Sequence, residues 1–196
     1  LIDDLVTKES HEPYRMMTSR AEYRLLLRQD NADQRLTEKG YEVGLISQER
    51  YDRLKKKERL IESEIERLKN AYVGTSEKVQ ELLESYESTP LNSGSSLAEL
   101  IRRPELSYEA VADIDVTRPK LPEDLAEEVI GQVDISLKYD GYIQRQKRQV
   151  EQFKKMENKK IPEDMDYDAV NSLRIEAVQK LKEYRPVSIG QASRIS

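Results

Sequence analysis

Cysteine and tryptophan are absent from the 196-residue sequence, which contains only one phenylalanine and one histidine. The absence of cysteine excludes disulfides, thiolate metal sites and a cysteine nucleophile, and it is typical of a protein in the reducing cytoplasm. The single histidine, His11, has no cysteines or clustered carboxylates near it in the sequence. It therefore predicts neither a metal site nor a catalytic triad.

Glycine and proline are scarce, with seven residues of each, which favours long charged helices over a sheet sandwich. The glycines form no G-x-G-x-x-G or Walker arrangement that would hold a phosphate group. No apolar run approaches the roughly 18 residues of a membrane span, and the N-terminus has neither an initiator methionine nor a signal-peptide pattern. We therefore expect a fragment without a membrane segment that acts as a binding or scaffolding domain and has no catalytic centre of its own.

Charge is plentiful but unevenly distributed, with 36% charged residues and a net charge of −5. Residues 138–160 contain eight Lys or Arg and three Asp or Glu, whereas residues 105–128 contain eight acids and two cations. Such a polarised chain can offer one basic face to phosphates. The alternative is that the basic and acidic segments pair with each other in the fold.

Two long periodic segments predict helices. Ser47 is a suitable cap for a helix over residues 48–72, and the residues that form its heptad seam are Tyr51, Leu54, Glu58, Ile61, Ile65, Leu68 and Tyr72. A second helical pattern follows over residues 122–157, and its expected buried side comprises Leu125, Val129, Val133, Leu137, Val150, Phe153 and Met156. Shorter helices are expected after Ser76 and over residues 96–102 and 107–113.

These patterns predict an all-α fold, with an elongated helical domain of long helices and a small C-terminal helical subdomain. We expect three regions: a junction segment at 1–46, a main helical subdomain at 47–157, and the C-terminal subdomain at 158–196.

Arg20, Arg24 and Arg28 recur at every fourth position after Ser19 and Glu22, which stand in the relation of a capping box. On a helix this spacing stacks three guanidinium groups along one face. Neighbouring acids can neutralise them, or an anionic ligand can bind them, because arginine matches phosphate oxygens bidentately. Residues 25–27 fit a short strand equally well, and a second helix through Arg35 is expected to end near Gly40 or Gly44.

A second candidate region surrounds two tyrosines. Tyr139 and Tyr142 lie three residues apart, with Gly141 between them, and the neighbouring cations are Lys138, Arg145, Lys147 and Arg148. Cations that hold a backbone beside rings that stack unpaired bases suit RNA. Alternatively, Tyr142 belongs to the core, and Gly141 permits tight helix–helix packing or close approach by a ligand.

Several segments resemble the C-terminal part of one family. They are residues 18–37, residues 90–104 with the core Ser96-Leu97-Ala98-Glu99-Leu100, residues 138–143, residues 158–162, and residues 185–196. From about residue 12 onward the order and spacing resemble the glucose-inhibited division protein A family (MnmG/GidA). Met17 departs from this pattern, because members often have Phe there.

The resemblance implies a parent flavoprotein that binds FAD, uses NADH and, with a GTPase subunit, installs carboxymethylaminomethyl on the wobble uridine of tRNA. It implies a homodimeric parent, a FAD domain before the junction segment, and further helices after the truncated C-terminal subdomain. The expected tRNA contacts are Arg20, Arg24, Arg28, Arg35, Lys138, Tyr139, Tyr142, Arg145 and Arg148. The expected partner contacts are Ser188, Ile189, Gln191 and Arg194. The alternative function is a general helical interaction or scaffold domain with no RNA role.

Overall fold

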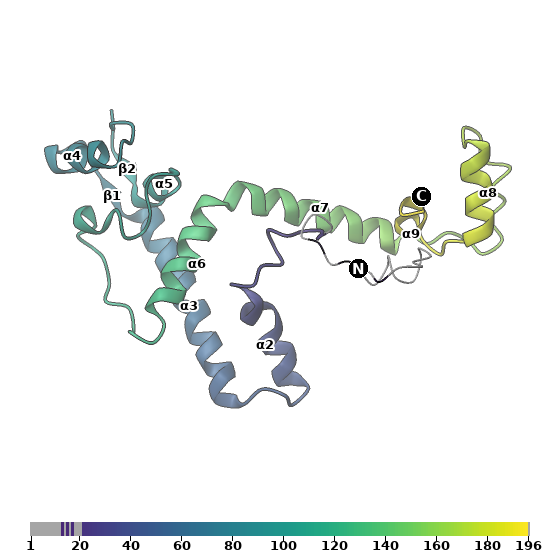
Figure 1. Ribbon diagram of the computed structural model, residues 1–196, viewed down its shortest axis with the longest axis horizontal. Coiled ribbons are helices and arrows are strands. Elements are labelled where there is room, and N and C mark those ends of the chain that lie inside the picture. Colours follow the sequence, from purple (N-terminus) through teal and green to yellow (C-terminus); the bar gives the residue numbers. More distant parts are fainter. Residues whose placement is uncertain (1–12, 14, 16, 18–20, 196) are drawn as a thin grey trace. The chain divides into compact units, whose positions relative to one another are not determined.

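The computed structural model describes residues 13, 15, 17 and 21–195, and helices dominate these residues (Figure 1). The prediction of an all-α fold is confirmed, with one very small sheet added. The chain divides into two compact units. One comprises residues 27–143, and the other comprises residues 144–195 with the described part of residues 1–26.

The unit of residues 27–143 holds most of the regular structure. Its helices are α2 (Ala32–Glu42), α3 (Gln48–Asn70), α4 (Glu77–Ser85), α5 (Leu97–Ile101), the 3₁₀ helix η2 (Ala112–Ile114) and α6 (Ala126–Lys138). Strands β1 (Tyr72–Val73) and β2 (Ser95–Ser96) pair antiparallel. Helix α7 (Asp140–Asn158) begins in this unit and continues into the other.

Helix α3 is the element against which its unit is built. Ser47 accepts a hydrogen bond from the backbone N–H of Arg50, as the expected cap. Leu54, Ile61 and Leu68 are buried along the predicted seam. The helix ends at Asn70, two residues earlier than predicted, and Tyr72 is exposed because it belongs to β1.

The core fills the space between α3, α4, α5 and α6. Leu68, Leu83, Leu100, Val129 and Val133 are completely buried in it. Each such side chain contributes about 1.5–3 kcal/mol of hydrophobic stabilisation relative to an exposed one. Ser96 and Glu99 form a capping box that fixes the start of α5 within this core. The predicted buried side of residues 125–137 is therefore confirmed.

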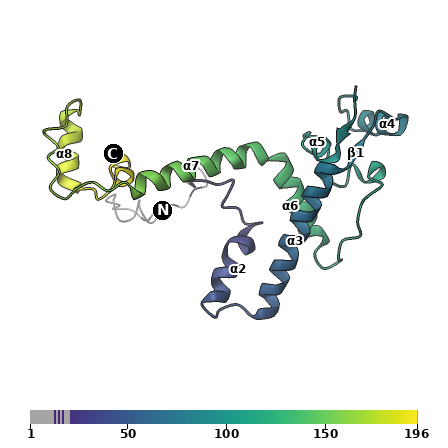
Figure 2. The same ribbon diagram turned by 180° about the vertical axis from the view of Figure 1, so that it is seen from behind.

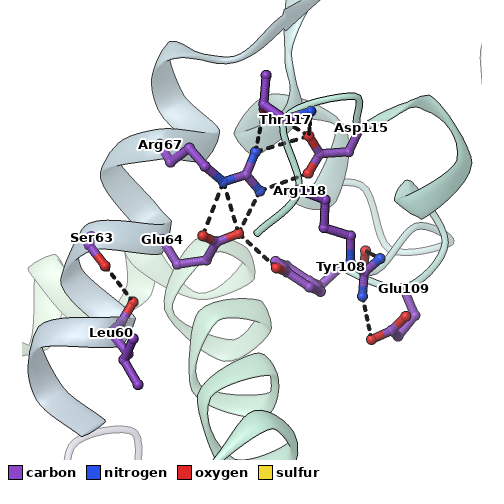
Figure 3. A network of polar contacts seen from close by, with 9 residues as sticks. All are labelled: Leu60, Ser63, Glu64, Arg67, Tyr108, Glu109, Asp115, Thr117 and Arg118. Atoms are coloured by element: carbon purple, nitrogen blue, oxygen red, sulfur yellow. Dashed lines mark hydrogen bonds and ion pairs between the residues drawn. The ribbon is translucent and has the colours of Figure 1, made fainter. Parts of the chain in front are cut away.

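A cluster of charged side chains lies beside this core (Figure 3). The guanidinium of Arg67 donates from Nε to Glu64 at 3.0 and 3.1 Å, and from Nη1 and Nη2 to Asp115 at 2.9 and 2.7 Å. The side chains of Glu64 and Asp115 are only 4% and 2% exposed. The hydroxyl of Tyr108 donates to Glu64 at 2.7 Å. One arginine thus pairs with two buried carboxylates and ties α3 to the loop before α6.

The pKa values in this cluster follow from its geometry. Burial alone would raise the pKa of Asp115, but hydrogen bonds from Arg67 and Thr117 hold it below its ordinary value of 3.8. Asp115 therefore stabilises the fold above about pH 4, and this contribution is lost as the pH falls through its lower folded pKa. Burial and the bond to Glu64 raise the pKa of Tyr108, so its phenol stays protonated.

A second buried cation joins three helices of the same unit. Lys57 of α3 has a side chain that is 3% exposed, and its Nζ lies 2.8 Å from Asp33 of α2 and 2.7 Å from Glu128 of α6. Arg53 also donates to Glu128, at 2.7 Å. Burial lowers the pKa of Lys57, but the hydrogen bonds that Lys57 donates to the two carboxylates outweigh this effect and raise the pKa overall. Lys57 therefore remains charged and helps to fix α2 and α6 on α3.

The C-terminal unit contains the rest of α7 together with α8 (Ile175–Tyr184) and α9 (Ile189–Ser193). Residues 159–161 run antiparallel to residues 187–189, with backbone bonds from Ile161 to Val187 and from Ile189 to Lys159. Tyr167 is buried, but α7 and α8 contain no buried residues. Figure 2 shows both helices from behind. The expected burial of Met156 is wrong, because that side chain is exposed.

Other local expectations also fail. Residues 107–113 form turns and the start of η2 rather than a helix. The expectation of tight helix–helix packing at Gly141 is wrong, because a Cβ placed there would meet nothing within 4 Å.

Helix α2, in contrast, agrees with the expectation. It ends at Glu42 and is followed by Gly44 in the left-handed conformation at φ +78°.

The Arg67 cluster predicts a large effect of one substitution. Arg67→Met keeps most of the aliphatic stem but leaves two buried carboxylates without a cation, so the free energy of unfolding should fall by about 3–5 kcal/mol. The measurement is urea unfolding followed by circular dichroism. Arg59→Met is the matched control, because Arg59 is an exposed arginine of the same helix. Equal, small losses in both variants would show that the cluster is not needed for stability.

Candidate nucleic-acid interface

The arginine-rich segment does not form the predicted helix. Arg20 lies outside the described residues, and residues 22–26 form turns, with Tyr23 at φ +52°. The Asn31 side chain accepts the backbone N–H of Arg28 at 3.2 Å, and Arg35 donates to the Arg28 carbonyl at 3.1 Å. These side chains replace helical hydrogen bonds for the backbone at Arg28. The expected arginine face, and the alternative strand at residues 25–27, are therefore both wrong.

The described arginines of this segment differ in their surroundings. Arg28 pairs with Asp30 at 3.0 Å and donates to Gln132, and the guanidinium of Arg35 bonds to Asn31 at 3.0 Å. Arg24, in contrast, is exposed and has no hydrogen bond or ion pair within the described residues. Neutralisation by a neighbouring acid thus holds for Arg28, whereas Arg24 is available to an anion.

The two tyrosines lie at the junction of α6 and α7. The side chains of Tyr139 and Tyr142 are 45% and 61% exposed, so the assignment of Tyr142 to the core is wrong. Lys138 donates to the carbonyl of Pro104 at 3.3 Å, and Arg102 pairs with Asp140 at 3.5 Å. Two cations therefore accompany two exposed rings on residues 27–143. This combination suits unpaired bases and their phosphates.

The C-terminal part of α7 carries a dense set of exposed cations. They are Arg145, Lys147, Arg148, Lys154 and Lys155. None of the five has an ion pair or hydrogen bond through its side chain to another described residue. Lys154 and Lys155 were not among the expected contacts, although their spacing of seven residues from Lys147 and Arg148 would have placed them on the same faces of the helix.

Several side chains of residues 188–194 form hydrogen bonds or ion pairs within their own unit. Ser188 caps α9 by accepting the backbone N–H of Gln191, and the Gln191 side chain accepts the backbone N–H of Val187 at 2.8 Å. Arg194 forms an ion pair with Glu157 of α7. Gly190 lets α9 approach closely, because a Cβ there would lie 3.0 Å from the backbone nitrogen of Glu157. Of the four expected partner contacts, only Ile189 has an exposed side chain.

Charge separates between the two units. Residues 144–196 contain twelve Lys or Arg and eight Asp or Glu, whereas residues 27–143 contain seventeen and twenty-five. The net charge of −5 therefore conceals a positive C-terminal stretch and an acidic one before it. A polyanion is attracted to the former and repelled by the latter.

The described residues show no group of three or more His, Cys, Asp or Glu side chains placed to hold a metal ion. Among the same residues, no helix is long and apolar enough to cross a membrane. The exposed cations and rings are thus the features of this part of the chain that point to a ligand.

Comparison with known proteins identifies the family of this chain. Residues 48–147 match the profile of the tRNA modifying enzyme MnmG/GidA C-terminal helical domain. Residues 149–196 match the profile of the tRNA modifying enzyme MnmG/GidA C-terminal helical bundle. The change from one profile to the other falls inside α7.

The relatives are tRNA uridine 5-carboxymethylaminomethyl modification enzymes named MnmG. The protein of Lachnoclostridium phytofermentans is 65% identical and that of Caldicellulosiruptor saccharolyticus 60% identical, each over the whole chain. A crystal structure of Aquifex aeolicus GidA is 39% identical, with a TM-score of 0.70, and covers the whole chain.

The chain spans 31% of the length of these two relatives and 29% of the Aquifex aeolicus chain. Because the first profile alone matches more than half of its residues, the chain belongs to the family of MnmG/GidA C-terminal helical domains.

Proposed function

We propose that this chain is the tRNA- and partner-binding C-terminal region of an enzyme that installs carboxymethylaminomethyl on the wobble uridine of tRNA. The names of its relatives support the reaction and the substrate. A general helical scaffold with no RNA role is not favoured, because both matching profiles describe tRNA-modifying enzymes.

The observation that carries the proposal is the set of exposed cations on α7 that have no ion pair with another described residue, in a chain of net charge −5. Within a folded protein, acids usually neutralise so many neighbouring cations. Here the acids of residues 27–143 pair with Arg53, Lys57 and Arg67 of α3 instead. Phosphates of a bound RNA would supply the missing counter-charge.

The parent would take FAD and NADH, but the residues of this chain do not fit either group. A dinucleotide site uses a glycine-rich turn between a parallel strand and a helix. The seven glycines have no such spacing, and the strands among the described residues are two residues long and antiparallel. In this proposal the cofactors are held by another domain of the parent, and the present chain binds and orients tRNA.

The remaining partners also belong to the proposal. They are the FAD domain of its own chain, a GTPase subunit, and a second copy of the parent, all in the cytoplasm. The three predicted regions, 1–46, 47–157 and 158–196, remain a prediction in this scheme. Exposed Ile175, Val187 and Ile189 in the C-terminal unit support a protein contact there.

Arg145→Ala in the full-length parent tests the proposed function. Each lost phosphate contact should make the negative slope of log affinity against log salt less steep by roughly 0.7–0.9. The measurement is tRNA binding at several salt concentrations. Lys56→Ala, which removes an exposed cation of α3, is the matched control and should keep the parental slope. A parent that binds no tRNA, or an unchanged slope for Arg145→Ala, would count against the proposal.

A second pair of variants separates binding from structure in the arginine-rich segment. Arg24→Ala should weaken tRNA binding while the free energy of unfolding changes by less than about 0.5 kcal/mol, because Arg24 has no partner within the described residues. Arg28→Ala should lower the unfolding free energy by about 1 kcal/mol, because it loses bonds to Asp30 and Gln132. Urea unfolding and tRNA titration of both variants provide the comparison. Equal behaviour of the two variants would contradict this division.

A further inference from the structure

We propose that one surface of α7 binds the two strands of a double-stranded RNA stem. This surface consists of Lys147, Arg148, Lys154 and Lys155, with Glu151 at their centre. The inference rests on the proposed function, because it names the part of a tRNA that this helix holds. All five side chains are exposed and lie in the C-terminal unit.

The helix arranges the four cations in two rows. Lys147 and Lys154 are seven residues apart, as are Arg148 and Lys155, so each pair lies on one line about 10.5 Å long. Adjacent residues of a helix are about 100° apart around its axis, which separates the rows by roughly 8–9 Å at the surface of a helix 10–12 Å wide. The four charges therefore mark the corners of a rectangle rather than a single line.

Glu151 occupies the middle of that rectangle. It is four residues from Lys147 and Lys155 and three from Arg148 and Lys154, the spacings at which helix side chains meet. No ion pair joins it to any of them within the described residues. One carboxylate among four cations leaves a net charge of +3 over two turns of helix. Such repulsion is relieved when phosphates bind the cations.

The composition of this surface favours a duplex over a single strand. Single-strand surfaces stack bases on aromatic rings, and none of the five residues is aromatic. Two rows of cations match two phosphate backbones on either side of a groove. A-form RNA exposes its 2′-hydroxyls in a wide, shallow minor groove. A carboxylate placed between the backbones accepts hydrogen bonds from those hydroxyls but would repel a phosphate.

This arrangement explains why an acid lies at the centre of a cationic surface. DNA of the same sequence has no 2′-hydroxyl to donate, so Glu151 contributes only repulsion against it. The surface should therefore prefer an RNA stem to a DNA stem through shape and 2′-hydroxyls, without reading the base sequence.

Two double variants of the full-length parent test the cation rows, Lys147→Ala/Lys154→Ala and Arg148→Ala/Lys155→Ala. In each variant the negative slope of log affinity for tRNA against log salt should become less steep by roughly 1.8. Binding at 0.1 M salt should weaken roughly tenfold or more. Lys56→Ala/Arg59→Ala removes the same charge from an exposed part of α3 and should leave both quantities at the parental value. Circular dichroism checks that all variants are folded.

Glu151→Gln tests the centre of the surface, with a 16-base-pair RNA duplex and a DNA duplex of the same sequence as probes. The ratio of RNA to DNA affinity should fall severalfold, because DNA binding gains from lost repulsion while RNA loses a charged acceptor. Glu62→Gln, an exposed acid of α3, should leave that ratio unchanged.

The outcomes separate this inference from the proposed function. If the parent binds tRNA, but both double variants keep its salt slope and Glu151→Gln keeps its RNA-to-DNA ratio, the four cations are a solvated helix face and the inference is wrong. If the parent binds no tRNA, the proposed function fails first.

Discussion

The ion pairs of the Arg67 guanidinium are the interaction on which the stability of the unit of residues 27–143 depends. The guanidinium lies between Glu64 and Asp115, two carboxylates that are almost completely removed from water. Buried charges destabilise a fold unless they are paired and hydrogen-bonded. Tyr108 and Thr117 supply further hydrogen bonds to the same carboxylates. The loop before α6 is thereby fixed to α3, and α6 is the helix that leads into α7.

Pairing inside this unit also shapes the surface of the chain. Acids of this unit form ion pairs with Arg53, Lys57 and Arg67. Helix α3 therefore offers fewer cations to a ligand than its sequence indicates. Within the described residues, the five cations of α7 from Arg145 to Lys155 form no ion pair with an acid. Both long helices contain several Lys and Arg, yet α3 uses three of its cations in ion pairs that stabilise the fold, whereas the proposed role of those on α7 is to bind tRNA.

The sequence predicted the elements that depend on local patterns. The Ser47 cap and the seam through Leu54, Ile61 and Leu68 lie as expected, and the short helix expected over residues 96–102 is present as α5. These features are encoded by residues three or four positions apart. The excess of cations over residues 138–160 is likewise visible in the sequence alone, whereas the part of Arg145 and Arg148 in tRNA binding stays a prediction.

The failures come from hydrogen bonds and ion pairs that helix periodicity does not encode, whether their partners are near or distant in the sequence. Lys57 and Glu64 lie outside the predicted seam of α3, but Asp33, Glu128 and Tyr108 make their burial possible. The helix expected around Arg24 and Arg28 is replaced by turns, which Asn31, Arg35 and Gln132 stabilise. Such partners, up to about a hundred residues away, leave no periodic signal.

The central claim is that tRNA lies on the positive stretch of this chain and avoids the acidic one. Ultraviolet crosslinking of tRNA to the full-length parent, followed by mass spectrometry of the crosslinked peptides, tests it directly. Crosslinks concentrated in residues 138–160, and absent from residues 105–128, are the predicted result. Crosslinks concentrated in residues 105–128, with none in α7, would contradict the account.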